Sequence, residues 1–196
     1  MKTFLILWLL VSDALANGSG LQSGDLVFLS LGCRMCELIE KTTASPFSHV
    51  GIVQIVKGEE PSVIMAVPPQ VMRVTLSEAV VNAKKPPVFM RMRSLENQRL
   101  AELAVQKAAA FLGRPYDDDF VLEKSKLYCS ELIYFSFLEA SGERFSLFKL
   151  QPMKIDPFSK EWEELLGHSP PEGKLGLSPG DLARSSYLGV FEPHSL

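Results

Sequence analysis

The distribution of apolar residues predicts several short strands in the first half of the chain. Turn residues interrupt short runs rich in valine, isoleucine and phenylalanine, a pattern typical of antiparallel sheets whose strands follow one another. In the stretch VFMRMR, apolar side chains alternate with charged or polarisable ones, which is the period of a strand. The predicted strands cover residues 24–29, 49–56, 62–67, 70–76 and 88–93.

The second half of the chain carries its apolar residues mainly at helical spacing. They recur every three or four positions over residues 95–112, and Gly113 followed by Pro115 ends the pattern. A second long helix begins at Cys129 and ends near Gly142. We predict one α+β domain in which an antiparallel meander packs against these two helices. Shorter helices are predicted at 33–43, 77–82, 160–166 and within 177–183, and an edge strand at 188–191.

The first sixteen residues have the pattern of a signal peptide. Lys2 precedes an apolar run at 4–11 that is too short to span a bilayer, and Ala14-Leu15-Ala16 supplies the small residues of a cleavage site. No cysteine stands at the cleavage position, so lipid attachment is not predicted. We expect residues 1–16 to be removed, and residues 17–196 to form a single secreted or periplasmic domain with no transmembrane anchor. The alternative is an uncleaved N-terminal anchor.

Composition narrows the range of partners. The chain has 196 residues, of which 46% are hydrophobic and 22% charged, a balance that suits one globular domain with a core of its own. The formal net charge is -3 and no basic block is present. This argues against nucleic acid as a partner.

Three cysteines restrict the chemistry further. Cys33 and Cys36 have the CxxC spacing, and Cys129 stands alone. In an oxidising compartment an odd number leaves one thiol over. We interpret Cys33 and Cys36 as a short disulfide or two packed thiols; a zinc site lacks further ligands at suitable spacing, and a thioredoxin-like role has no other support. No metal or cofactor is predicted.

Cys129 and His49 are the candidate catalytic pair. A cysteine in the first turn of a helix lies where unpaired N–H groups and the helix dipole stabilise a thiolate. His49 begins an apolar strand, whereas His168 falls in a predicted surface loop and His194 in the last residues. Near neutral pH an imidazole suits a base that takes and returns the thiol proton. Taken singly, each residue also fits a purely structural, buried role.

Several motifs in this order resemble one known group of proteins. The segments FSHVGIV (47–53), GRPYD (113–117) and YCSEL (128–132) occur in the order of the circularly permuted papain-like hydrolases, the YiiX/YaeF-like branch of the NlpC/P60 superfamily. The flanking stretches GDLVF (24–28) and SPGDLA (178–183) also look like elements of that family. In ordinary NlpC/P60 enzymes the cysteine precedes the histidine; here His49 comes first, as the permuted order requires.

The resemblance implies a fold, an activity and a set of site residues. The fold is a permuted papain-like one, an antiparallel meander or half-barrel against helices, with the nucleophile at a helix N-terminus. Cys129 would be the nucleophile and His49 the base and then the acid, while the N–H of Cys129 would help to hold the oxyanion. Tyr116, Tyr128 and Ser130 would form the substrate and oxyanion pocket. Asp117 is a weaker candidate for the site, because an acidic triplet such as 117–119 is typical of a solvated loop.

One departure from the family pattern concerns the residue that orients the imidazole. The family usually carries a polar residue there, often glutamate, and this chain has Met65, which cannot accept the imidazole N–H. Gln70 on the next strand is the candidate third residue. A Cys–His dyad is therefore our main interpretation, and a catalytically degraded binding module on the same fold is the alternative. A thiol redox protein that uses Cys33 and Cys36 is the third hypothesis.

The predicted activity is hydrolysis of an amide or another acyl bond. Export makes a cell-wall peptide one candidate substrate, and an N-acyl lipid is the other. The aromatic and leucine-rich C-terminal part supplies either an apolar groove for an acyl chain or side chains that close the core. These residues are Phe145, Leu147, Phe148, Leu150, Phe158 and Trp162.

Overall fold

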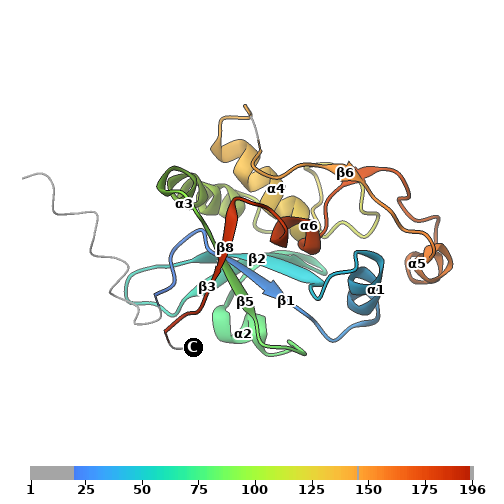
Figure 1. Ribbon diagram of the computed structural model, residues 1–196, viewed down its shortest axis with the longest axis horizontal. Coiled ribbons are helices and arrows are strands. Elements are labelled where there is room, and N and C mark those ends of the chain that lie inside the picture. The colour runs from blue at the N-terminus through green and yellow to red at the C-terminus, as the bar shows by residue number, and fades with distance from the viewer. Residues whose placement is uncertain (1–19, 145, 195–196) are drawn as a thin grey trace, which may run out of the picture.

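The computed structural model describes residues 20–144 and 146–194, and the predicted signal peptide lies outside these residues. Six of its strands form one sheet (Figure 1). The strands are β1 (Leu26–Leu29), β2 (His49–Gln54), β3 (Ser62–Val67), β4 (Gln70–Thr75), β5 (Val88–Met92), β6 (Gln151–Pro152), β7 (Leu175–Gly176) and β8 (Leu188–Phe191); the helices are α1 (Arg34–Thr42), α2 (Leu76–Val80), α3 (Leu95–Ala110), α4 (Cys129–Ala140), α5 (Ser159–Leu166) and α6 (Pro179–Ala183).

The main sheet is antiparallel throughout and has the order β4-β3-β2-β1-β5-β8. The predicted meander is confirmed, and so is β8 as an edge strand. The ladder between β2 and β3 is short, because it ends at the pair Ile52↔Ile64 while β3 continues against β4 alone. The first half of β2 therefore has a free edge on the side of β3, and this opening becomes important for the site.

Helices cover both faces of the sheet (Figure 1). The long helices α3 and α4 lie together on one face, where the largest core cluster joins them to alternate residues of the strands, such as Phe28 and Ile52. The short helix α2 covers the other face, over a second cluster that includes Val27 and Met65. The period of two along each strand explains this division, because successive side chains point to opposite faces.

Two features differ from the sequence-based expectations. Thr75 caps α2 and shares a capping box with Glu78, so the helix begins at Leu76 rather than at Ser77. The irregular C-terminal part contains a small ribbon in which Pro152 of β6 pairs with Leu175 of β7. Sequence patterns did not reveal this ribbon, because two-residue strands carry no period.

Cys33 and Cys36 form a disulfide at the start of α1. The disulfide confirms one of the two interpretations for this pair. It leaves Cys129 as the free cysteine of the chain.

Candidate active site

The thiol of Cys129 lies at the first residue of α4 and is buried, with 4% of the residue exposed. Burial raises the pKa of the thiol to about 11, although the Ser130 hydroxyl and the backbone N–H groups of Val50, Ser130 and Cys129 itself oppose the shift. The expectation that the helix start would lower the pKa of this thiol is therefore wrong. The cause is desolvation, which opposes the charged form of a buried group.

His49 begins β2 and is also buried, with 5% of the residue exposed. Burial lowers the pKa of its imidazole to about 4, so the ring is neutral at pH 7. Its Nε2 atom has no hydrogen-bond partner among the described residues. The candidate pair thus consists of a neutral imidazole with a free nitrogen and a neutral thiol, rather than an ion pair.

The free edge of β2 is where the strand meets the start of α4. The N–H of Val50 belongs to the half of β2 that has no partner on the side of β3, and it donates to the sulfur of Cys129. His49 is the preceding residue on the same strand, although its Nε2 atom makes no hydrogen bond to the sulfur. The role of the Val50 amide was not predicted, since backbone donors leave no signal in a sequence.

Met65 lies on the neighbouring strand β3, close to Gly51 of β2. The register Ile52↔Ile64 places Gly51 opposite Met65, and His49 and Gly51 share one face of β2. A side chain on Gly51 would collide with Val63, at 2.4 Å, so only glycine fits there. Gln70 is exposed at the start of β4 and does not bond Nε2 of His49, which has no partner among the described residues. The structure thus gives no support to Gln70 as the third residue.

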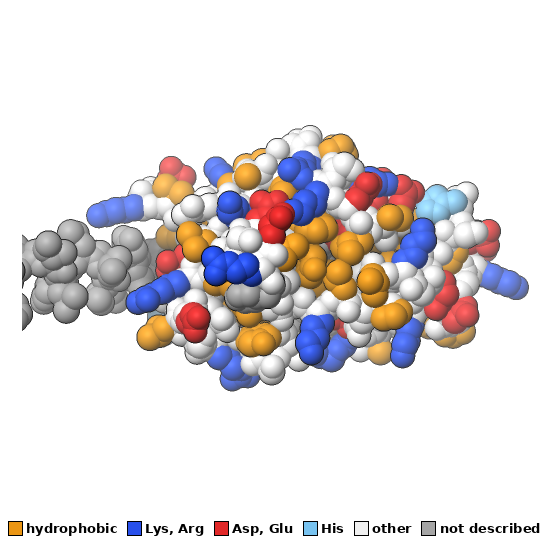
Figure 2. All heavy atoms as spheres, turned by 90° about the horizontal axis from the view of Figure 1, so that it is seen from above, with side chains coloured by type: hydrophobic (Ala, Val, Ile, Leu, Met, Phe, Trp, Pro, Cys, Tyr) orange, Lys and Arg blue, Asp and Glu red, His pale blue; other side chains and the backbone are white. Residues whose placement is uncertain are grey.

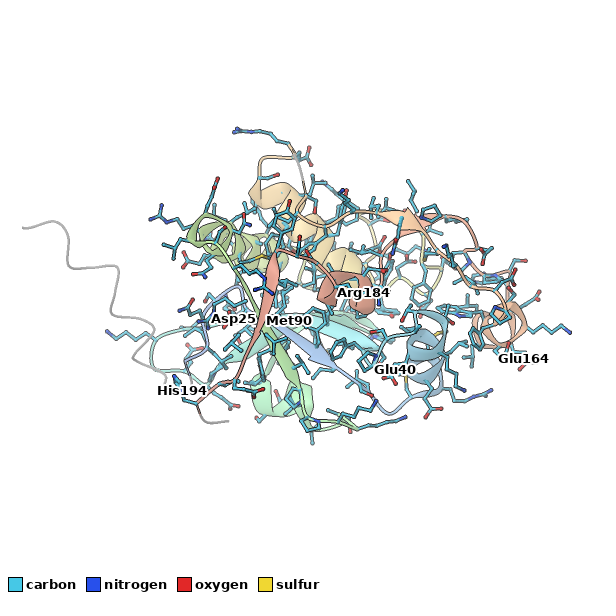
Figure 3. The ribbon with its side chains drawn as sticks, in the orientation of Figure 1. Asp25, Glu40, Met90, Glu164, Arg184 and His194 are labelled. Carbon is cyan, nitrogen blue, oxygen red and sulfur yellow. A yellow bond between two sulfur atoms is a disulfide. The ribbon has the colours of Figure 1, made fainter. Side chains whose placement is uncertain are left out.

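A cavity of about 250 Å³ opens beside Cys129. Its walls come from parts of the chain that are distant in sequence: α1, the loop before α4, the β6–β7 ribbon, α5 and the start of α6. Figure 3 labels Arg184, a lining residue, at the end of α6. Asp181 pairs with Arg184 at 2.7 Å. The apolar lining residues are Ile39, Phe120, Pro152, Met153, Ile155, Trp162, Leu177 and Pro179.

The three predicted pocket residues have different positions. Tyr128 lines the cavity, and its hydroxyl accepts a hydrogen bond from the N–H of Leu177 at 3.3 Å. Ser130 is fully buried behind the nucleophile, with its Oγ 3.8 Å from the sulfur. Tyr116 is half-buried, and burial, followed by the charges of Cys129 and two acidic neighbours, raises its pKa.

The acidic triplet is not simply a solvated loop. Asp117 is fully buried and accepts hydrogen bonds from the N–H groups of Asp119 and Val121. The ammonium of Lys126 lies 3.1 Å from Asp117 and also contacts Asp119. The earlier interpretation is therefore wrong for Asp117, whose carboxylate organises the loop that leads to Cys129. His168 is exposed, as predicted, and lies 3.1 Å from Asp119.

A sheet that meets a buried cysteine at a helix start, with the histidine strand earlier in the chain, defines a permuted papain-like cysteine hydrolase. Comparison with known proteins gives the same result. The chain belongs to the family described as permuted papain-like amidase enzymes, YaeF/YiiX, C92 family, which it matches over residues 20–188. The predicted family, the fold class and the amide-hydrolase kind of activity are confirmed.

Relatives of this chain are found in Escherichia coli. The chain is 29% identical over 148 residues to the protein of strain K12 named "Uncharacterized protein YiiX". The matched residues make up 74% of this chain and 71% of that protein. It also resembles the crystal structure of the metalloprotein YiiX from strain O157:H7, with a TM-score of 0.74 and 25% identity over 88% of this chain and 97% of that one.

The word metalloprotein raises the question of a metal site. Within residues 20–144 and 146–194, no group of three or more histidine, cysteine or acidic side chains is arranged to hold a metal ion. The ammonium of Lys126 already lies among the carboxylates of Asp117, Asp119 and Glu123. The residues present do not fit a metal, so we derive no metal-dependent step.

No helix within residues 20–144 and 146–194 is long and apolar enough to cross a membrane.

Proposed function

We propose that Cys129 and His49 hydrolyse an amide whose acyl part is apolar and lies in the cavity beside the sulfur. The observation that carries this proposal is the cavity itself: the nucleophile forms part of a pocket lined mainly by aliphatic and aromatic side chains. Such a lining suits a hydrocarbon group better than a charged peptide. This favours an N-acyl substrate over a cell-wall peptide.

The reaction starts from two neutral groups. The sulfur of Cys129 attacks the carbonyl carbon while the imidazole of His49 takes the thiol proton, so that no free thiolate is needed in the empty site. The N–H of Cys129 stabilises the oxyanion. His49 then gives its proton to the departing amine and leaves a thioester on Cys129. A water molecule, deprotonated by His49, hydrolyses the thioester and releases the acid.

The sequence further supports an extracytoplasmic setting. The apolar run at 4–11 and the Ala14-Leu15-Ala16 motif favour cleavage after Ala16, and the Cys33–Cys36 disulfide fits an oxidising compartment. We propose a secreted or periplasmic hydrolase formed by residues 17–196. Mass spectrometry of the chain recovered from its host tests this point: a mass corresponding to residues 17–196 is expected, and the mass of the full chain would contradict export with cleavage.

A chain-length series tests the substrate proposal. The purified protein would be given p-nitroanilides of acetic, butyric and octanoic acid, and a dipeptide p-nitroanilide with a free amino terminus. We expect turnover to rise from acetyl to octanoyl and to be lost in Cys129→Ala and His49→Gln. His168→Gln, at an exposed histidine that does not line the cavity, serves as the matched control. Faster turnover of the dipeptide than of octanoyl anilide would contradict an apolar acyl group.

A binding module on the same fold is the second candidate. The specific observation in its favour is that Met65 occupies the strand position where the family carries a polar residue, while Nε2 of His49 has no partner among the described residues. An imidazole without an orienting acceptor populates the wrong tautomer. Saturable binding of octanoyl glycine, with no hydrolysis of any anilide in the series, would favour this candidate.

A further inference from the structure

Glu131 is a buried carboxyl group that the proposed reaction does not use. It lies in the first turn of α4, two residues after the nucleophile, and its side chain is fully buried. Oε2 accepts a hydrogen bond from the N–H of Tyr128 at 3.3 Å. Oε1 is buried without a hydrogen-bond partner among the described residues. A buried polar atom without a partner is costly and calls for an explanation.

The surroundings of Glu131 differ from those of an ordinary helix cap. A glutamate at this position is normally exposed and ionised, since its negative charge suits the helix dipole. Here burial, together with the charges of Asp117 and Glu123, raises the pKa of Glu131 to about 9, although the hydrogen bond from the N–H of Tyr128 opposes the shift. The carboxyl is therefore neutral at pH 7, while Lys126 balances the neighbouring Asp117.

Tyr128 connects this carboxyl to the cavity. Its N–H donates to Glu131, and its hydroxyl accepts from Leu177 on the far wall of the cavity. Gly176 has no room for a side chain, because an added Cβ would lie 2.9 Å from the Tyr128 hydroxyl. Tyr128 is thus held at both ends, and the next residue along the chain is Cys129. A shift of Tyr128 would rotate the peptide between Tyr128 and Cys129. It would thereby turn the Cys129 N–H, which donates to the oxyanion in the proposed reaction.

We propose that the side chain of Glu131 is a positioning group, which fixes the Tyr128–Cys129 turn through its bond to the Tyr128 N–H and so sets the direction of the Cys129 N–H and of one cavity wall. This inference deepens the proposed function and rests on it. The role needs a hydrogen-bond acceptor without a charge, because a carboxylate would lie beside Asp117. Glutamine meets this requirement and alanine does not.

Acylation of the nucleophile tests the proposal through a pair of variants. Pre-steady-state release of p-nitrophenol from p-nitrophenyl acetate would be followed at pH 7 in the full chain, in Glu131→Gln and in Glu131→Ala. We expect Glu131→Gln to keep the acylation rate within about threefold and Glu131→Ala to lower it about 10- to 100-fold, as a misplaced reacting group does. Ser136→Ala, on the same buried side of α4, is the control for loss of packing. An equal loss in the glutamine and alanine variants would overturn the proposal.

Amide hydrogen exchange tests the same proposal by a measurement that does not depend on catalysis. The amides of Tyr128 and Cys129 should exchange at least about tenfold faster in Glu131→Ala than in Glu131→Gln, while exchange in the middle of α4 stays unchanged. Equal protection in both variants would overturn the proposal. If the unaltered chain acylates no faster than Cys129→Ala, the proposed function fails, and the exchange experiment alone then decides the role of Glu131.

Discussion

The indole N–H of Trp162 donates a hydrogen bond to the hydroxyl of Thr42 at 2.8 Å, although the two residues are 120 positions apart in the chain. Trp162 belongs to α5 and Thr42 ends α1. Both line the cavity beside Cys129, and the Trp162 ring stacks edge-on against Phe120. This bond joins the N-terminal and C-terminal parts of the cavity wall. Figure 1 shows α5 next to α1, at the end of the molecule away from α3.

The Trp162–Thr42 contact should be visible in stability. Trp162→Ala removes a large buried side chain and should lower the free energy of unfolding by about 3–5 kcal/mol. Trp162→Phe, which loses mainly the hydrogen bond, should cost about 1 kcal/mol. Urea unfolding measures both, and a double-mutant cycle with Thr42→Val isolates the bond. Strictly additive costs in that cycle would show that the bond contributes nothing.

His49 should make the protein sensitive to acid. Its pKa is about 4 in the folded chain, compared with 6.5 as the ordinary value. At pH 7 neither state binds this proton; as the pH falls from 6.5 to 4, the unfolded state takes it up and the folded state does not, so stability is lost. The loss should approach about 3 kcal/mol. Urea unfolding between pH 4 and 7 should therefore show a steeper decline in the unaltered protein than in His49→Gln. Parallel curves would mean that the imidazole is solvated.

The thiol of Cys129 should react with iodoacetamide only at high pH. Because burial raises its pKa to about 11, alkylation should keep rising above pH 9, and a neutral His49 should make little difference to the profile. The Cys33–Cys36 disulfide leaves Cys129 as the reacting thiol. Mass spectrometry of unreduced protein after timed alkylation measures the rate. A midpoint below about pH 8.5 that disappears in His49→Gln would instead reveal a thiolate–imidazolium pair.

The ion pair between Arg91 and the buried Asp25 should contribute strongly to the stability of the fold. Two guanidinium nitrogens of Arg91 donate to the two carboxylate oxygens of Asp25 at 2.7 Å each, and 1% of Asp25 is exposed. Arg91→Met leaves the buried Asp25 carboxylate without its partner and should lower the free energy of unfolding by about 3–5 kcal/mol. Adding Asp25→Asn to the same chain should restore part of this loss. Thermal and urea unfolding check both. The exposed Arg73 is the control, since Arg73→Met should change stability by less than about 0.5 kcal/mol. Equal effects of the two arginine changes would contradict a structural role for the pair.

Sequence patterns located nearly all the elements that build the site, because those elements have a period. The strand at Ser62–Val67 and the starts of the helices at Leu95 and Cys129 appear where expected. The six main strands and two long helices bury continuous stripes of apolar side chains, and such stripes are visible in one dimension. His49 and Cys129 were found because a strand start and a helix start place polar atoms at the margin of a core.

Features that depend on distant partners were not predictable. Asp117 lies in an acidic triplet, yet local N–H groups and Lys126 allow it to be fully buried. The thiol of Cys129 lies at a favourable helix start, yet its burial by other segments reverses the shift of its pKa. Of the C-terminal residues considered for an acyl groove, Trp162 lines the cavity, whereas Phe148 packs in the main core. Figure 2 shows further hydrophobic side chains on the face over α4 and the β6–β7 ribbon, with charged residues around them.

The order in which the cavity walls appear in the sequence affects how the protein matures during synthesis. His49 and Cys129 are synthesised before the residues of the β6–β7 ribbon, α5 and α6. A nascent chain that ends after α4 therefore carries both reactive side chains but lacks most of the cavity wall that would receive an acyl group. Since chains are made from the N-terminus onward, all the pocket residues are present only after Arg184 has been added, and a product terminated before the β6–β7 ribbon would have the nucleophile without the means to select a substrate.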